Sequence, residues 1–156
     1  MNDILAKLSA GEKLFGLGAL VTIVAWVLGL LLSSKSVCYE GFGQKICGDS
    51  VNYFTHGHGT DLGLIALIGA IVGIVVLYIK NAPNMKVNWP APLPVIMLGI
   101  AGAVLIAAAL AFLLDFLDAK DVMGELPIFF WLAEIGMVVG GALMAWPAYQ
   151  AWVASK

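Results

Sequence analysis

The sequence predicts an all-α membrane protein, a bundle of four transmembrane helices with a short disulfide-pinned β-hairpin in its first outer loop. Of the 156 residues, 62% are hydrophobic and only 12% are charged, which is about half the charged fraction of a soluble domain. The apolar residues gather in four blocks, 14–33, 62–79, 95–114 and 128–146. Each block has about the 20 residues that a helix needs to cross the hydrocarbon core. We therefore expect residues 1–156 to form a single integral membrane domain.

Helix-boundary signals agree with these blocks. Ser9 and Glu12 have the spacing of a capping box, so a helical turn is predicted to begin before the first block. Thr60–Asp61 can cap the second helix. Pro94 and Pro127 fit the first turns of the third and fourth helices, where a missing backbone N–H costs nothing.

The distribution of lysines predicts the orientation of the chain in the membrane. Most lysines lie in the N-terminal arm, the middle loop and the C-terminal tail: Lys7, Lys13, Lys80, Lys86 and Lys156. The remaining two loops hold the others: Lys35, Lys45 and Lys120. Because lysine-rich loops tend to stay on the cytoplasmic side, we expect both termini in the cytoplasm and the first and third loops outside.

Small residues recur at four-residue spacing in three of the blocks. These candidate helix-packing positions are Gly69 and Gly73, then Gly99, Ala103, Ala107 and Ala111, and finally Gly136 and Gly140. Such rows let helix backbones approach closely in lipid. They indicate internal packing of the bundle, or, for at least one row, docking against another protein.

The two cysteines lie together in the first outer loop. Residues 37–47 have the pattern of a tight hairpin, and a turn at 41–44 places Cys38 opposite Cys47. This register also opposes Tyr39 with Ile46 and Glu40 with Lys45. Opposed cysteines on an oxidising side are expected to form a disulfide.

The only two histidines follow shortly after this hairpin. His56 and His58, with Asp61 nearby, are the side chains that could hold a metal, or ligate a haem or pigment. Two histidines are few for either purpose, so we expect no metal and no cofactor.

Two acids lie near the outer ends of the last two blocks. Glu134 is the one ionisable residue inside a block, and Asp115 directly follows the third. A helical hairpin would place both carboxyls at similar depth, where they could share a proton or hold a cation. In the alternative interpretation, Asp115 is solvated at the membrane interface, while Glu134 is protonated or bonded to a neighbouring helix.

The segment Leu8–Lys13 has the sequence Leu-Ser-Ala-Gly-Glu-Lys and runs directly into a glycine-containing first block. In this respect the chain resembles uncharacterised small bacterial four-span proteins that open with an S/T-x-G-E-K segment. The resemblance implies a location in the bacterial plasma (inner) membrane and implies no chemistry.

Function is constrained mainly by what the sequence lacks. The net charge is −2 and there is no arginine, which argues against nucleic-acid binding. No catalytic motif is present, so we do not expect an enzyme. The expectation is a non-enzymatic accessory or scaffold subunit, surrounded by lipid and partnered by other membrane proteins or by itself. The alternative is a proton- or cation-coupled transporter or channel subunit that uses Glu134 and Asp115.

Overall fold

The computed structural model describes residues 8–41, 44–82, 85, 87–119 and 126–156, and gives the backbone alone for 37–41, 44–49 and 119. Four long helices dominate this part of the chain. They are α2 (Ala10–Leu32), α4 (Leu62–Asn81), α5 (Leu93–Ala119) and α6 (Ile128–Ala154). All four are long and apolar enough to cross a membrane, which is the architecture of a multi-pass membrane protein.

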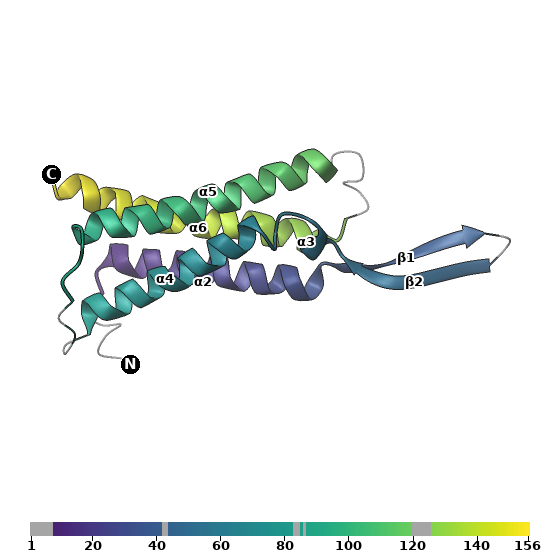
Figure 1. Ribbon diagram of the computed structural model, residues 1–156, viewed down its shortest axis with the longest axis horizontal. Helices are drawn as coiled ribbons and strands as arrows, with labels where there is room; N and C mark the ends of the chain where they lie inside the picture. Colours follow the sequence, from purple (N-terminus) through teal and green to yellow (C-terminus); the bar gives the residue numbers. More distant parts are fainter. Residues whose placement is uncertain (1–7, 42–43, 83–84, 86, 120–125) are drawn as a thin grey trace.

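The helices form an up-down-up-down bundle (Figure 1). Each packs against two neighbours in the cyclic order α2, α4, α5, α6, and the most extensive contact joins α2 to α6. As a result, α2 begins and α6 ends at the same end of the bundle. We call this the terminal end, and the opposite end, from which the two strands project, the hairpin end.

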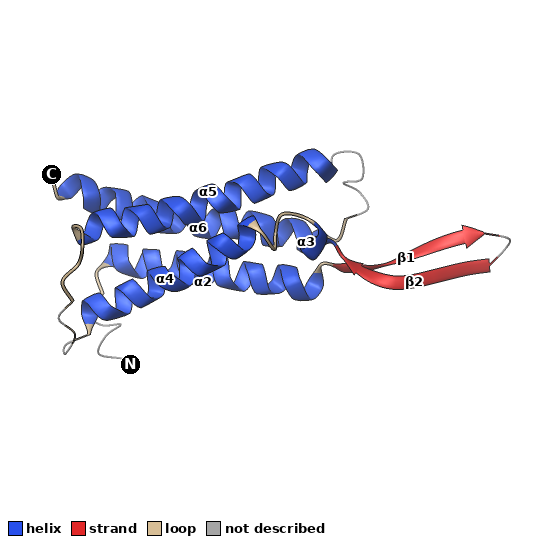
Figure 2. Ribbon diagram, viewed as in Figure 1, coloured by secondary structure: helices blue, strands red, loops and turns tan. Residues whose placement is uncertain are grey.

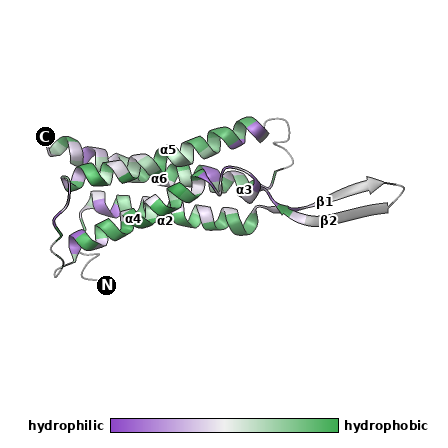
Figure 3. Ribbon diagram, viewed as in Figure 1, coloured by the Kyte–Doolittle hydropathy of each residue, from purple (hydrophilic) through white to green (hydrophobic). Residues whose placement is uncertain are grey.

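The four helices consist mostly of hydrophobic residues, with hydrophilic residues mainly near their ends (Figure 3). Large side chains point outward from every helix, including Leu31, Ile68, Ile106 and Leu132. The interior is built instead from small residues with a few large ones, such as Phe15 and Met144, which are fully buried. Lipid solvates apolar side chains, so this inverted distribution of size suits a membrane-embedded bundle.

The two strands form one antiparallel ribbon, β1 (Ser34–Gly41) and β2 (Gln44–Asn52) (Figure 2). The predicted register is confirmed, because Cys38 pairs with Cys47. The ribbon is longer than the predicted short hairpin, since it continues through an irregularity after Ser36 down to the pair formed by Ser34 and Asn52.

Several of the predicted helix boundaries need adjustment, and one of them is the end of α5, which runs to Ala119 rather than to 114. The capping box is confirmed: the Ser9 N–H donates to Glu12 Oε2 over 2.7 Å, and the Glu12 N–H donates to Ser9 Oγ over 3.2 Å. Asp61 occupies the N-cap of α4 but makes no side-chain capping bond. Pro127 is the N-cap of α6 rather than part of its first turn, and α6 continues through Pro147 well past the predicted end at 146.

Candidate functional site

The most unusual feature of the bundle is a pair of buried carboxyl groups at the hairpin end. Glu134 on α6 has no solvent exposure, and Asp115 near the end of α5 is 4% exposed. The two groups interact across the gap between their helices. Asp115 Oδ2 and both Glu134 oxygens nevertheless lack a hydrogen-bond partner of ordinary geometry. The predicted alternative in which Asp115 is solvated is therefore wrong.

The loop between α3 (Tyr53–His56) and α4 covers this pair. The backbone N–H of His58 donates to Asp115 Oδ1 over 2.8 Å. A Cβ atom on Gly57 would lie 2.7 Å from the same oxygen. The absence of a side chain at Gly57 is therefore what lets the loop approach the carboxylate closely enough for this bond.

Aromatic residues hold the same loop in place on the side that faces the bundle. The Trp26 indole N–H donates to the carbonyl of Gly59 over 3.1 Å, and the Trp26 ring meets the Phe54 ring edge-on, with centroids 6.3 Å apart. Phe54 is fully buried, and a Cβ atom on Gly59 would lie 2.5 Å from its ring. The loop is thus a packed part of the hairpin end.

Asn52 joins the ribbon to this packed region. Its side-chain oxygen accepts hydrogen bonds from the N–H groups of Phe54 and Thr55 at the start of α3. Its amide nitrogen donates to the carbonyl of Leu30 over 2.6 Å, near the end of α2. One side chain therefore ties the base of the ribbon to both helices.

The histidines do not come together as a metal site. His56 is exposed at the end of α3, whereas His58 Nε2 lies 3.7 Å from Asp118 Oδ2 on α5. Among the described residues, no three histidine, cysteine or acidic side chains are placed to bind a metal ion. Sequence reasoning missed the more important contribution of His58, which comes from its backbone N–H and leaves no trace in the residue type.

Toward the middle of the bundle, the interior beside Glu134 is tightly packed. Gly136 approaches Ala25 so closely that an added Cβ would lie 2.8 Å from the alanine Cβ. One turn further, the Thr22 hydroxyl donates to the Gly18 carbonyl within its own helix, over 3.0 Å. Thr22 is therefore the described buried polar side chain that follows Glu134 toward the terminal end, and its hydroxyl is already bonded within α2.

The predicted packing glycines and alanines separate into two groups. Those that face other helices are Gly69, Gly73, Ala107, Ala111, Gly136 and Gly140. Gly99 and Ala103 on α5 are instead exposed, and a Cβ atom on Gly99 would meet nothing within 4 Å. The sequence analysis overlooked Gly18 and Gly29, which form the α2 side of the closest helix contacts.

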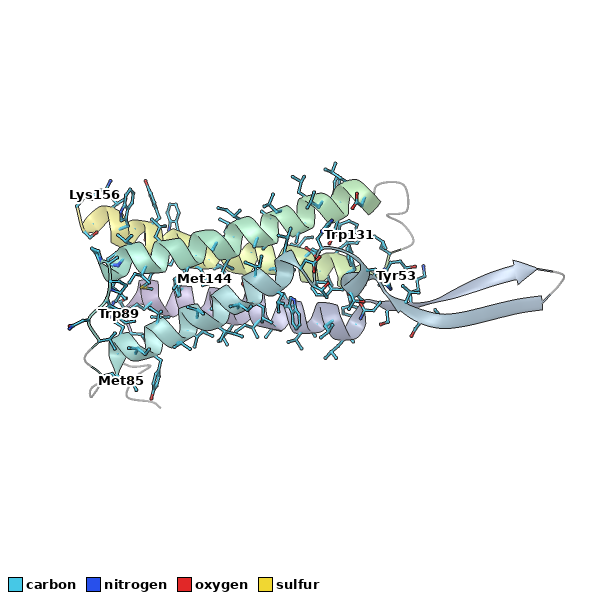
Figure 4. The ribbon with its side chains drawn as sticks, in the orientation of Figure 1. Tyr53, Met85, Trp89, Trp131, Met144 and Lys156 are labelled. Atoms are coloured by element: carbon cyan, nitrogen blue, oxygen red, sulfur yellow. The ribbon has the colours of Figure 1, made fainter. Side chains whose placement is uncertain are left out.

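At the terminal end, polar and aromatic side chains mark the other boundary of the bundle. Lys80 Nζ on α4 lies 2.6 Å from Glu12 Oε1, as an ion pair rather than a directed hydrogen bond. Trp89 and Lys156 lie at this end, whereas Tyr53 and Trp131 lie at the hairpin end (Figure 4). Aromatic residues at both ends are typical of membrane interfaces.

No family model matches the chain, and no curated protein or solved structure is similar to it. The class of protein is therefore defined by the fold, which is that of a multi-pass helical membrane protein.

Proposed function

We propose that this chain is a non-enzymatic accessory or scaffold subunit that binds other membrane proteins, or further copies of itself, in a bacterial plasma membrane. Both termini are cytoplasmic in this proposal, so the ribbon is external. The observation that carries it is the projection of β1 and β2 away from the bundle (Figure 2). In the described part of the chain, the ribbon contacts the helices chiefly at its base, where Asn52 bonds to α2 and α3 and β1 lies against the short α3.

A free two-stranded ribbon needs further support. Isolated hairpins are marginally stable in water, and both edges of this ribbon have unpaired backbone groups, because the sheet has only two strands. A disulfide between Cys38 and Cys47 would supply one support, and a partner protein lying along the ribbon would supply the other. Docking to an external surface is therefore the role we assign to the ribbon.

The first half of α5 offers a second contact surface, inside the membrane. Gly99 and Gly102 have open space where a Cβ would be, and Ala103 beside them is exposed. Internal packing does not account for these small residues, because no described neighbour lies close to the two glycines. A helix of a partner protein could approach this face closely.

Photocrosslinking tests the proposal directly. A photoreactive residue at Ser50, which is exposed in β2, should capture one defined partner, or a second copy of the chain, in native membranes. The same residue at Ile68, which is 52% exposed on α4, reports on random encounters. Equal and diffuse crosslinking at the two positions would contradict a docking role for the ribbon.

The α5 face has its own test with a matched control. Gly99→Leu fills the open face, and we expect at least a several-fold loss of copurified partner while the bundle stays folded. Ala142→Leu adds a similar side chain at an exposed position of α6 and should leave the amount unchanged. Retention of the partner by Gly99→Leu would remove α5 from the interface.

The buried carboxyl pair favours a second candidate function, a proton- or cation-coupled transporter or channel subunit that uses Glu134 and Asp115. Unpartnered ionisable groups within a membrane span often mark ion pathways. Flux through reconstituted vesicles should then be abolished in Glu134→Gln. Absence of flux in the wild-type protein, or equal flux in the variant, would leave the accessory subunit as the sole proposal.

A further inference from the structure

The carboxyl pair at the hairpin end has an unbalanced charge. Glu134 and Asp115 are both buried, and three of their four carboxyl oxygens lack a hydrogen-bond partner. In the part of the chain that the structure describes, His58 is the only cationic type of side chain that acts on either group. Two adjacent ionised carboxylates in such a place would be strongly destabilising. The pair therefore needs one positive charge between its oxygens.

The surroundings favour a proton over a metal ion as that charge. Calcium binds six to eight oxygen ligands and magnesium requires a nearly octahedral set. The site offers three free carboxyl oxygens, and no third ligating side chain of the described residues joins them. A proton needs only one oxygen that carries it and one that accepts it.

The loop hydrogen bond assigns the proton to one of the two groups. Asp115 Oδ1 accepts the His58 N–H over 2.8 Å, and a hydrogen bond from a backbone amide favours the ionised form of a carboxyl group. Glu134 receives no such bond. We propose that Asp115 and Glu134 form a binding site for a single proton, with the acid on Glu134 and the carboxylate on Asp115.

Among the described residues, the polar groups next to the pair lie toward the hairpin end. Asp118, whose side chain is 79% exposed, lies 3.7 Å from the His58 imidazole, and the backbone of His58 contacts Asp115. In the part of the chain that the structure describes, these are the titratable groups that act on the pair. Beyond Glu134 the contacts between α2 and α6 are close and apolar around Gly136. The bound proton therefore exchanges with the hairpin side, and passage further along the bundle, as the transporter alternative requires, would need α2 and α6 to move apart around Gly136.

Proton binding is coupled to the position of the α3–α4 loop. Loss of the proton leaves two carboxylates side by side directly beneath Gly57 and His58, and their repulsion displaces Asp115 from its bond with the loop. The loop leads through α3 to Asn52 at the base of the ribbon. The site thus holds the base of the ribbon in place when it is protonated, whether or not the chain has the accessory role proposed above.

The Trp26 indole N–H provides a local reporter for this coupling, because it donates to Gly59 in the same loop. The protein in lipid nanodiscs, with labelled tryptophan indoles and labelled glutamate carboxyl carbons, would be titrated by NMR from mildly acidic to alkaline pH. We expect the Glu134 carbon to show the protonated form at neutral pH. Its deprotonation at higher pH should coincide with a shift of the Trp26 indole signal.

Two variants distinguish the effect of the Glu134 proton on the Trp26 signal from other effects of pH. Glu134→Gln replaces the acid O–H by an amide N–H that can donate to Asp115, so the Trp26 signal should stay at its protonated position and lose its pH dependence completely. Asp61→Asn removes an exposed carboxylate at the end of the same loop that makes no side-chain capping bond, and it should keep the wild-type response.

Three results would overturn the inference. The first is a Glu134 carboxyl carbon whose NMR signal is that of an ionised carboxylate at neutral pH. The wild-type titration reveals this result without any variant. The second is a Glu134 signal that moves when sodium or calcium is added at constant pH, which would assign the site to a metal cation. The third is a pH-dependent Trp26 signal in a folded Glu134→Gln protein. None of these results depends on the copurification and crosslinking experiments, so the two proposals fail separately.

Discussion

Gly18 on α2 and Gly140 on α6 face each other at the closest approach of the two helices, where a Cβ atom on Gly18 would lie 2.6 Å from the Gly140 carbonyl oxygen. A Cβ on Gly140 would in turn lie 2.7 Å from the Gly18 carbonyl oxygen. Neither backbone could make room for an added Cβ atom unless its whole helix moved. Because α2 and α6 join the start and the end of the bundle, this contact closes the ring of four helices.

Gly140→Ala should therefore destabilise the bundle. Overpacking of a tight contact typically costs about 1–3 kcal/mol, and the better helix propensity of alanine offsets no more than about 1 kcal/mol of this. The free energy of unfolding, measured by titration with a denaturing detergent, should fall. Gly102→Ala is the matched control, because its Cβ would meet nothing within 4 Å. A loss of stability of the same size in both variants would show that the crossing is not the cause.

The Glu12–Lys80 ion pair gives a prediction at the other end of the bundle. Glu12→Gln keeps a residue that can complete the capping box with Ser9 but removes the charge that faces Lys80. We expect Glu12→Gln and Lys80→Gln each to cost up to about 1 kcal/mol, because Lys80 is partly exposed and solvent weakens the pair. The double variant should cost little more than either single variant, which a double-mutant cycle would measure. Fully additive losses would mean that the two residues do not interact.

Much of the fold follows from the sequence, because a single physical requirement decides it. Apolar blocks of about 20 residues have to be helical in lipid, and the four blocks are four helices in the structure. The ribbon register was also predictable, since the alternation from Cys38 to Cys47 permits one pairing around the turn. Helix ends were less accurate: α6 continues to Ala154, because a proline within a helix need not end it when neighbouring helices supply the packing.

The candidate site was only partly predictable. Spacing along the chain placed Asp115 and Glu134 at similar depth, but which faces of α5 and α6 meet depends on packing between helices. The loop over Asp115 depends on a backbone N–H and on the space left by Gly57. Neither feature is encoded in a motif. The sequence signal that comes closest is the pair of glycines around His58, which indicates close backbone approach as readily as flexibility.

The backbone register makes a disulfide between Cys38 and Cys47 a sharp prediction, although their side chains lie outside the described part of the chain. If the hairpin end is external, neither thiol should react with a maleimide reagent until a reductant is added. Closing a loop of this length contributes about 2–3 kcal/mol in the chain-entropy model. Reduction should therefore loosen the ribbon, seen as faster hydrogen exchange of β1 and β2, while the helices keep their protection. Thiols that react without reductant in freshly prepared membranes would contradict the bridge.

The same chemistry can decide the orientation of the chain. With lysines concentrated at the terminal end, we expect both termini in the cytoplasm and the ribbon outside. A single cysteine at Ser50 in a variant that lacks Cys38 and Cys47 should react in intact cells with a membrane-impermeant maleimide. A single cysteine at Ser155, which is exposed just after α6, should react only after the cells are opened. The reverse pattern would place the ribbon and the carboxyl pair on the cytoplasmic side. The proton on Glu134 would then exchange with the cytoplasm, and the ribbon would dock on a cytoplasmic surface of its partner.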